Sequence, residues 1–360
     1  MIKKTLLNLL FFNCYAYKAI VVVPVADLLG QPSQNINPNK FYNQLNPSTE
    51  LGTCHRINQS LFNEIVDVVQ EKGAEVEIAT RNCFIKNSTS DRYNKFWTLK
   101  SNIMPLEGLD RDKIPASSQV TLIKPFKYKK LTFSAGTNFV VQTETKNSCK
   151  VFILNPKTKN FDMVDIPKSY IFEPSDNRIN DFIRILKSWT NQKKVIPYVW
   201  GGTSFSKSYK KHKNAAEFHK FLSKTENVKS GMDCAGLILR AAQIAGIPYF
   251  YKNTTTLAAN LPKIRGIDSI ENGDLIFFPG HVIIISDIDK NLCIEARGYN
   301  HGYGIVQEIP LNQLFKDINN FNELRETYFR HKPLERLDSE QKIVQNIKNF
   351  QVLKFNQKSQ

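Results

Sequence analysis

The stretch Ser230-Gly231-Met232-Asp233-Cys234-Ala235-Gly236 opens an apolar run over residues 237–245, which Gly246 closes. Asp233 is a residue type that caps helices by accepting hydrogen bonds from free backbone N–H groups, and Gly246 suits the left-handed turn after a helix. We therefore predict one short helix that begins at Cys234. Because nearly every side of this helix is apolar, we expect it to be buried.

Cys234 lies at the first turn of the predicted helix. Unpaired N–H groups and the positive end of the helix dipole stabilise a thiolate there, which is the reactive form of cysteine. This position makes Cys234 a candidate nucleophile. Cysteine is also a small hydrophobic residue that is common in protein cores, so the rest of the chain has to decide between the two interpretations.

Three strands are predicted after this helix, over residues 275–278, 282–286 and 292–296, with turn residues between them. We expect an antiparallel meander against the helix, with His281 at the head of the second strand and Glu295 in the third. Adjacent strands lie about 5 Å apart, so the two side chains can meet.

A cysteine, a histidine and a polar orienting group form the layout that thiol catalysis needs. The imidazole takes the thiol proton and later protonates the leaving amine, while the third group holds the imidazole in place. Each residue has a plainer alternative: His281 as a turn residue, Glu295 as a solvent-facing residue, and Asp233 as a helix cap alone.

The composition is that of a globular protein with two or three domains: 360 residues, 41% hydrophobic and 23% charged. Lys and Arg number 49 against 33 Asp and Glu, which gives a net charge of +16 and favours polyanionic partners. The sequence has no basic stripe interleaved with aromatics and no zinc-finger spacing, so we expect no nucleic-acid partner. Its six cysteines form no CxxC pair, which favours neither a metal site nor a disulfide framework, although a bridge between Cys54 and Cys83 stays open.

The N-terminal segment has a positive start, a short apolar core and then small residues, which is typical of a secretory signal peptide over residues 1–18. Its apolar run is too short to span a bilayer, so we expect an exported protein without an integral membrane span. The alternative is a first buried strand that runs on from Ala19.

The rest of the chain divides by pattern into four further segments. Residues 19–108 and 109–172 are rich in short strands and turn signals, which predicts two small β barrels or sandwiches. Helical spacing over residues 175–189, with Asp176 as its cap, predicts the helix that enters the last domain, residues 173–332. The polar tail, residues 333–360, is expected to form a surface helix without chemistry.

Four motifs in this order resemble those of the NlpC-type cell-wall cysteine peptidases. The resemblance covers about residues 190–310 and implies an α+β, papain-like catalytic domain, with a helix packed on an antiparallel sheet and with neither metal nor cofactor. The motifs are Pro197-Tyr198-Val199-Trp200-Gly201-Gly202, Met232-Asp233-Cys234-Ala235-Gly236-Leu237, Gly273-Asp274-Leu275-Ile276-Phe277-Phe278 and Gly280-His281-Val282-Ile283-Ile284.

The resemblance implies a function. Members of this family attack an amide in peptidoglycan stem peptides, usually the bond from γ-D-glutamate to a diamino acid, through an acyl-enzyme thioester. By position the nucleophile is Cys234, the base is His281, and Tyr198 borders the active site. Asp233 matches the acidic residue that, in the dipeptide-releasing branch, meets the free amine of an N-terminal L-alanine.

The third catalytic position departs from the family pattern. Glu295 stands where the family usually has His, Asn or Gln; a carboxylate can still orient His281, and it would hold a charged imidazolium more strongly than an amide. Nearby His301 is the rival for this role.

The β-rich segments resemble the bacterial SH3-like domains of the same branch. In that branch the first such domain contributes acidic and aromatic contacts to the terminal amine of the substrate. Glu64, Tyr93 and Trp97 are the matching candidates for substrate binding.

A lysine-rich insertion over residues 203–230, with a helical pattern over 215–222, separates the first two motifs. It is either a solvated basic insertion or a lid or docking arm for anionic polymer at the edge of the cleft. We expect a monomer whose partner is peptidoglycan or its peptides. The rival functions are a non-catalytic wall-binding protein and a thiol amidase or acyltransferase that acts on another substrate.

Overall fold

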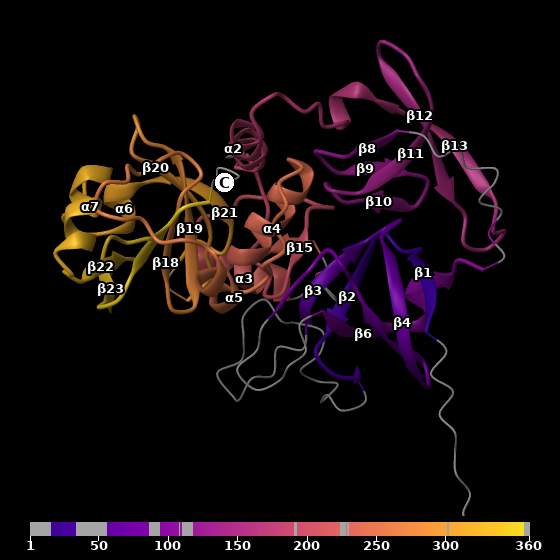
Figure 1. Cartoon of the computed structure of the whole chain (residues 1–360), viewed down its shortest axis with the longest axis horizontal. Helices are drawn as coiled ribbons and strands as arrows, with labels where there is room; N and C mark the ends of the chain where they lie inside the picture. Colours follow the sequence, from indigo (N-terminus) through magenta and orange to yellow (C-terminus); the bar gives the residue numbers. More distant parts are fainter. Residues whose placement is uncertain are drawn as a thin grey trace, which may run out of the picture.

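The computed structural model describes two β-rich units and one larger α/β unit. Figure 1 shows helix α4 (Cys234–Ile244) between the sheet of the α/β unit, on the left, and the two β units, on the right. Tyr93, His301 and most of the predicted signal peptide lie outside the described residues. The described residues are 16–33, 56–85, 94–107, 109, 118–190, 193–223, 228, 230–300 and 302–355.

The first β unit is one seven-stranded antiparallel sheet in the order β3-β2-β6-β5-β4-β1-β7. Strand β1 begins at Tyr17, so the predicted end of the signal peptide at residue 18 falls inside this strand. The β-rich character is confirmed, while the SH3-like assignment stays a prediction. The strands are β1 (Tyr17–Val21), β2 (Val25–Leu29), β3 (Arg56–Leu61), β4 (Ile65–Lys72), β5 (Glu75–Ala79), β6 (Lys95–Leu99) and β7 (Ile103–Pro105), with the short helix η2 (Lys100–Asn102).

The second β unit has a four-stranded sheet in the order β13-β12-β11-β8 and a hairpin of β9 and β10. Its core includes Phe62 of the first unit, whose ring centroid lies 4.9 Å from that of Phe133. The two β units therefore share a core. The elements are β8 (Gln119–Thr121), β9 (Phe126–Tyr128), β10 (Leu131–Phe133), β11 (Asn138–Glu144), β12 (Ser148–Leu154), β13 (Phe161–Pro167) and η4 (Lys168–Tyr170).

The α/β unit begins with helix α2 (Arg178–Trp189), as predicted, but its cap differs from the prediction. The Asn177 side chain accepts hydrogen bonds from the backbone N–H groups of residues 179 and 180, so Asn177 and not Asp176 is the cap. The elements between α2 and the central sheet are β14 (Lys194–Val195), β15 (Thr203–Ser204), β16 (Tyr209–Lys210), α3 (Ala215–Ser223), β17 (Gly231–Met232), α4 and α5 (Thr254–Asn260).

The central sheet has the order β21-β20-β19-β18-β24 and contains the predicted meander. Successive side chains alternate between its faces: Leu275 and Phe277 pack in the core with α4, whereas Ile276 and Phe278 pack in a second core with α6 and α7. Both faces are thus covered by helices. The strands are β18 (Leu275–Phe278), β19 (His281–Asp287), β20 (Leu292–Ala296), β21 (Val306–Pro310) and β24 (Gln351–Leu353), and the helices are α6 (Leu311–Leu314) and α7 (Phe321–Phe329).

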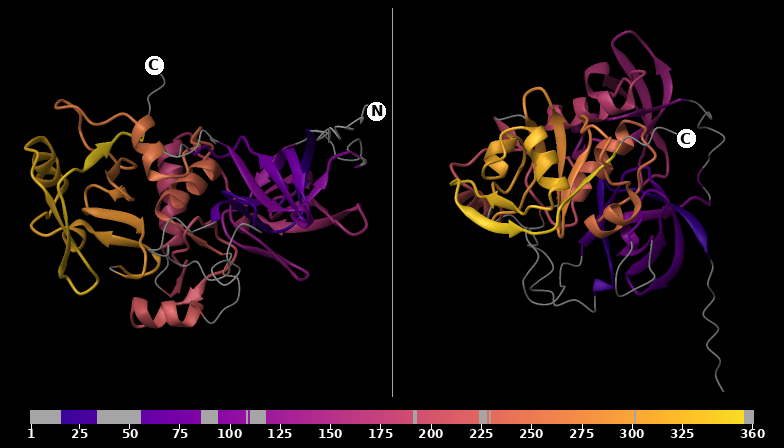
Figure 2. Two further views of the ribbon diagram at one scale, coloured as in Figure 1. Left: turned by 90° about the horizontal axis from the view of Figure 1, so that it is seen from below. Right: turned by 60° about the vertical axis from the view of Figure 1, so that its left-hand side comes forward.

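The C-terminal tail does not form the predicted surface helix. It forms the hairpin β22 (Leu334–Leu337) and β23 (Ile343–Ile347), and then β24, which pairs with β18. The reason is that Val352 and Leu353 are apolar and fully buried, so the tail completes the sheet. Figure 2 shows the yellow C-terminal strands against the orange sheet from two further directions.

Candidate active site

The start of helix α4 is fixed by the Asp233 carboxylate, as predicted. One oxygen, Oδ1, accepts a hydrogen bond of 2.6 Å from the backbone N–H of Gly236. The glycines of the motifs allow the chain to pack closely here: a Cβ on Gly236 would lie 2.1 Å from the carbonyl oxygen of Gly202. The Trp-Gly-Gly segment and the cysteine helix are therefore locked together by backbone contact.

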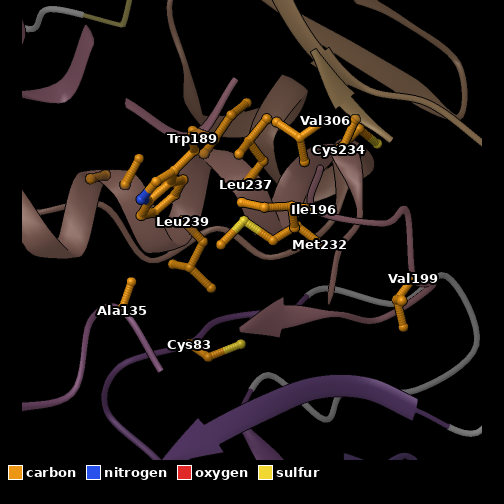
Figure 3. Packing of buried hydrophobic residues seen from close by; sticks show 14 of the residues in the cluster. Cys83, Ala135, Trp189, Ile196, Val199, Met232, Cys234, Leu237, Leu239 and Val306 are labelled. Atoms are coloured by element: carbon orange, nitrogen blue, oxygen red, sulfur yellow. The ribbon is translucent and has the colours of Figure 1, made fainter. Parts of the chain in front are cut away.

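Cys234 lies at the N-terminus of α4 and is 7% exposed. Figure 3 shows it with other members of its hydrophobic cluster, among them Met232, Leu237 and Val306. A residue of another unit, Cys83 of the first β unit, belongs to the same cluster. The cysteine helix is thus buried on the side of the sheet and on the side of the β units.

The thiol of Cys234 is not the stabilised thiolate that the helix dipole predicts. Burial and then the charge of Asp233 raise its pKa to about 12, and the opposing effects of Lys252 and of the backbone N–H groups of Val282 and Ala235 are smaller. Burial is the largest influence on this pKa, and it acts against the predicted stabilisation of a thiolate. A neutral thiol needs a base, and the influence of Val282 places the sulfur close to the strand that His281 begins.

His281 stands at the head of β19, and Glu295 lies in the neighbouring strand β20. The imidazole Nε2 and the Glu295 Oε2 are 2.8 Å apart and share a hydrogen bond. The predicted meeting of these two side chains is therefore present. Because Nε2 is engaged by Glu295, Nδ1 is the ring nitrogen left for proton exchange with a thiol.

Glu295 is fully buried and forms an ion pair with Arg336 of strand β22. The same oxygen, Oε2, accepts from Nη2 of Arg336 and shares the hydrogen bond with His281. The guanidinium also lies over two aromatic rings, 5.2 Å from the centroid of Phe278 and 5.6 Å from that of Phe315. Arg336 is thus held between the sheet and Phe315, the residue that follows α6.

Burial would raise the pKa of the Glu295 carboxyl, but the charge of Arg336 and the contact with His281 hold it well below its ordinary value. For His281, burial and the positive charges of Arg336 and Arg297 lower the pKa below 6.5 and outweigh Glu295. Glu295 by itself raises this pKa, as expected of a carboxylate, but the net shift is downward. Burial is the largest cause of the lowering, and the positive charge of Arg336 adds to it.

Asp233 is also paired with a buried cation. Its second oxygen, Oδ2, accepts hydrogen bonds from Nζ of Lys252 at 2.6 Å and from the backbone N–H of Gly201 at 2.9 Å. Lys252 is 3% exposed. The carboxylate beside the candidate nucleophile is thus a helix cap and one half of a buried ion pair.

Tyr198 lies next to the cysteine helix. It is buried and forms an isolated parallel β-bridge with Met232. Its backbone carbonyl accepts a hydrogen bond of 2.8 Å from the Tyr299 hydroxyl. Tyr299 in turn touches Phe218 and His219 of α3. The lysine-rich insertion therefore packs a helix, as predicted over 215–222, against the residues that border the site.

The candidates from the first β unit are separated by the structure. Glu64 reaches helix α4, where its Oε1 lies 3.2 Å from Nη1 of Arg240. Trp97 is buried with Leu29 in a small cluster of its own, apart from the cluster that contains Cys234. Tyr93 and His301 cannot be placed, because both lie outside the described residues.

The remaining sequence expectations concern cysteines, metals and membranes. Cys83 is a free buried thiol, and the possible partner Cys54 lies outside the described residues. Among the described residues, no group of three or more His, Cys, Asp or Glu side chains has the arrangement of a metal site. In the same part of the chain, no helix is long and apolar enough to cross a bilayer.

Lys252 and Arg336 were missed by the sequence analysis. The sequence signal for Arg336 is its spacing. It lies two residues after the buried Leu334, so both side chains lie on the same face of the strand. Lys252 follows Tyr249 and Tyr251 in a loop with no periodicity, and nothing local distinguishes it from a surface lysine.

No protein-family model matches the sequence, and neither does any curated protein. Among solved structures, the chain is similar to an NlpC/P60 family protein from Bacillus cereus ATCC 10987, with 18% identity and a TM-score of 0.59, over 82% of this chain and 95% of that one. It also resembles an NlpC/P60 endopeptidase from Photobacterium damselae subsp. piscicida, with 13% identity and a TM-score of 0.49, over 95% of this chain and 74% of that one. The Bacillus protein carries the argument: this chain has the NlpC/P60 fold, as its motifs predict.

Proposed function

We propose that this protein is a cysteine endopeptidase of the NlpC type that hydrolyses peptidoglycan stem peptides, at the bond between γ-D-glutamate and a diamino acid. The observation that carries the proposal is the pairing of His281 with a buried carboxylate on the strand that lies beside the cysteine helix. We further propose that the protein acts outside the cytoplasm, because its substrate is a wall polymer. We also propose that it is a monomer.

The reaction begins with a neutral pair. His281 Nδ1 accepts the thiol proton of Cys234 while the sulfur attacks the γ-carbonyl carbon of D-glutamate, which forms a C–S bond and a tetrahedral oxyanion. Free N–H groups at the start of α4 stabilise this negative charge. The imidazolium then gives its proton to the leaving amine of the diamino acid, the C–N bond breaks, and a thioester remains on Cys234.

Water completes the cycle. His281 accepts a proton from a water molecule, which attacks the thioester carbonyl, and the C–S bond breaks as the thiolate takes the proton back. Glu295 keeps the imidazole in one orientation through both halves, because Nε2 stays engaged while Nδ1 exchanges protons. Glu295 thus orients the imidazole through Nε2, whereas Cys234 and the water molecule exchange protons with Nδ1.

The test is cleavage of L-Ala-γ-D-Glu-diaminopimelate by the purified protein, followed by mass spectrometry. We expect release of the dipeptide L-Ala-γ-D-Glu by the wild type and none by Cys234→Ala. Cys83→Ala removes another buried thiol of the same cluster and serves as the matched control, which should retain cleavage. Cleavage by Cys234→Ala would contradict the mechanism, and a wild type that binds but never cleaves peptidoglycan would favour the wall-binding alternative.

A further inference from the structure

Both carboxylates that the resemblance assigns to the free amine of a substrate are already neutralised within the chain. Asp233 is paired with Lys252 at 2.6 Å, and Glu64 is paired with Arg240 at 3.2 Å. The two cations are almost fully buried, with side chains 3% and 4% exposed. Neither carboxylate thus offers an unbalanced negative charge.

The Asp233 carboxylate has little hydrogen-bonding capacity left. A carboxylate has about four acceptor positions, and here three are used by the N–H groups of Gly201 and Gly236 and by the Lys252 ammonium. An incoming ammonium would have to lose its water and lie beside the Lys252 charge. Two positive charges that lie side by side in a buried site repel each other strongly.

Lys252 is not a mobile surface lysine. Its backbone N–H donates to the carbonyl of Phe84, and the N–H of Phe84 donates to the carbonyl of Phe250, so the loop is held on the first β unit. Cys83, next to Phe84, is buried where the charges of Lys252, Glu64, Arg240 and Asp233 all act on its thiol. The two ion pairs therefore lie close to the same thiol, where the first β unit meets the cysteine helix.

We propose that Lys252 sets substrate choice by occupying the place of a substrate ammonium, so that this enzyme accepts stem peptides whose first amine is acylated. This inference rests on the proposed function. An acylated amine carries no charge and needs no carboxylate, and a stem peptide that is still joined through its L-alanine to an acyl group meets this condition. The chain thus favours attached stem peptides over released ones.

The experiment compares two substrates that differ only at the amine: L-Ala-γ-D-Glu-diaminopimelate and its N-acetyl derivative. For the wild type we expect a kcat/KM on the acetylated peptide that is at least as high as the value on the free one. Lys252→Met leaves Asp233 unpaired and should shift the ratio toward the free amine by about tenfold. Lys290→Met, which removes an exposed lysine paired with Asp287, should leave the ratio unchanged.

The outcomes separate the two proposals. A wild type that cleaves only the free-amine peptide, or has a higher kcat/KM on it, overturns the inference and leaves the endopeptidase proposal intact. A wild type that cleaves neither peptide overturns the proposed function and this inference with it. If Lys252→Met does not fold, the ratio measured for the wild type still decides the question.

Discussion

Two buried carboxylates flank the reacting groups of the candidate site, and they differ in how fully they are engaged. Asp233, beside Cys234, uses both oxygens for backbone N–H groups as well as for Lys252. Glu295, beside His281, uses only Oε2, while its Oε1 has no hydrogen-bond partner among the described residues. The first carboxylate is engaged through both oxygens, and the second through one.

This difference corresponds to two tasks. The pair of Asp233 and Lys252 fixes the start of a helix, which must not move. The pair of Glu295 and Arg336 holds an imidazole that gains and loses a proton, so its charge must be balanced. Together the side chains of Glu295 and Arg336 carry no net charge.

The largest effect is expected for Arg336→Met, which breaks the second pair and leaves a buried carboxylate without its counter-charge. We expect the free energy of unfolding to fall by about 3–5 kcal/mol, measured by denaturant titration. The pKa of His281 should rise, because Arg336 lowers it now, so the acid limb of kcat/KM moves to higher pH. A purely structural role would leave that limb in place.

The matched control for this variant is Arg330→Met, which removes an exposed arginine paired with exposed Glu326 in the same part of the chain. Its stability should change by no more than about 0.5 kcal/mol and its pH profile not at all. Equal behaviour of the two variants would contradict the role of Arg336.

A smaller effect of opposite sign is expected for Glu295→Gln. Glutamine can still orient the imidazole, so activity falls only in part, but Arg336 is left as an unbalanced charge and the pKa of His281 should drop further. The acid limb of kcat/KM then moves to lower pH. Combining Glu295→Gln with Arg336→Met should bring the acid limb of kcat/KM back toward its wild-type position. If both single variants moved the limb in the same direction, the balance of charge between Glu295 and Arg336 would not control the pKa of His281.

The sequence predicts what depends on local pattern. Asp233, the apolar run and Gly246 define helix α4 without tertiary information, and alternating apolar residues with turn signals define the meander that carries His281 and Glu295. Their adjacency follows because consecutive short strands pair with each other. These elements were predicted, while the catalytic roles of their residues stay a prediction.

What the sequence does not predict depends on distant partners. Arg336 reaches Glu295 only because the tail folds back onto the sheet, and Lys252 reaches Asp233 only because its loop binds the first β unit. The pKa of Cys234 depends first on burial, which segments distant in the sequence provide, and not on the helix end alone. No local periodicity encodes any of these contacts.

The smallest effect is expected in the pH dependence of the wild type. It distinguishes a neutral pair of the Cys234 thiol and the His281 imidazole at rest from a preformed ion pair of thiolate and imidazolium. Because the pKa of His281 lies below its ordinary value of 6.5, its basic form persists at lower pH, and kcat/KM should reach half of its maximum below pH 6.5.

Because the pKa of Cys234 is raised to about 12, the rate of its alkylation by iodoacetamide should rise with every increase in pH between about 7 and 10, without a plateau. Cys234→Ala provides the blank for the other thiols. A plateau at neutral pH would show that the thiolate already exists at rest, in which case Asp233 and burial do not control the nucleophile.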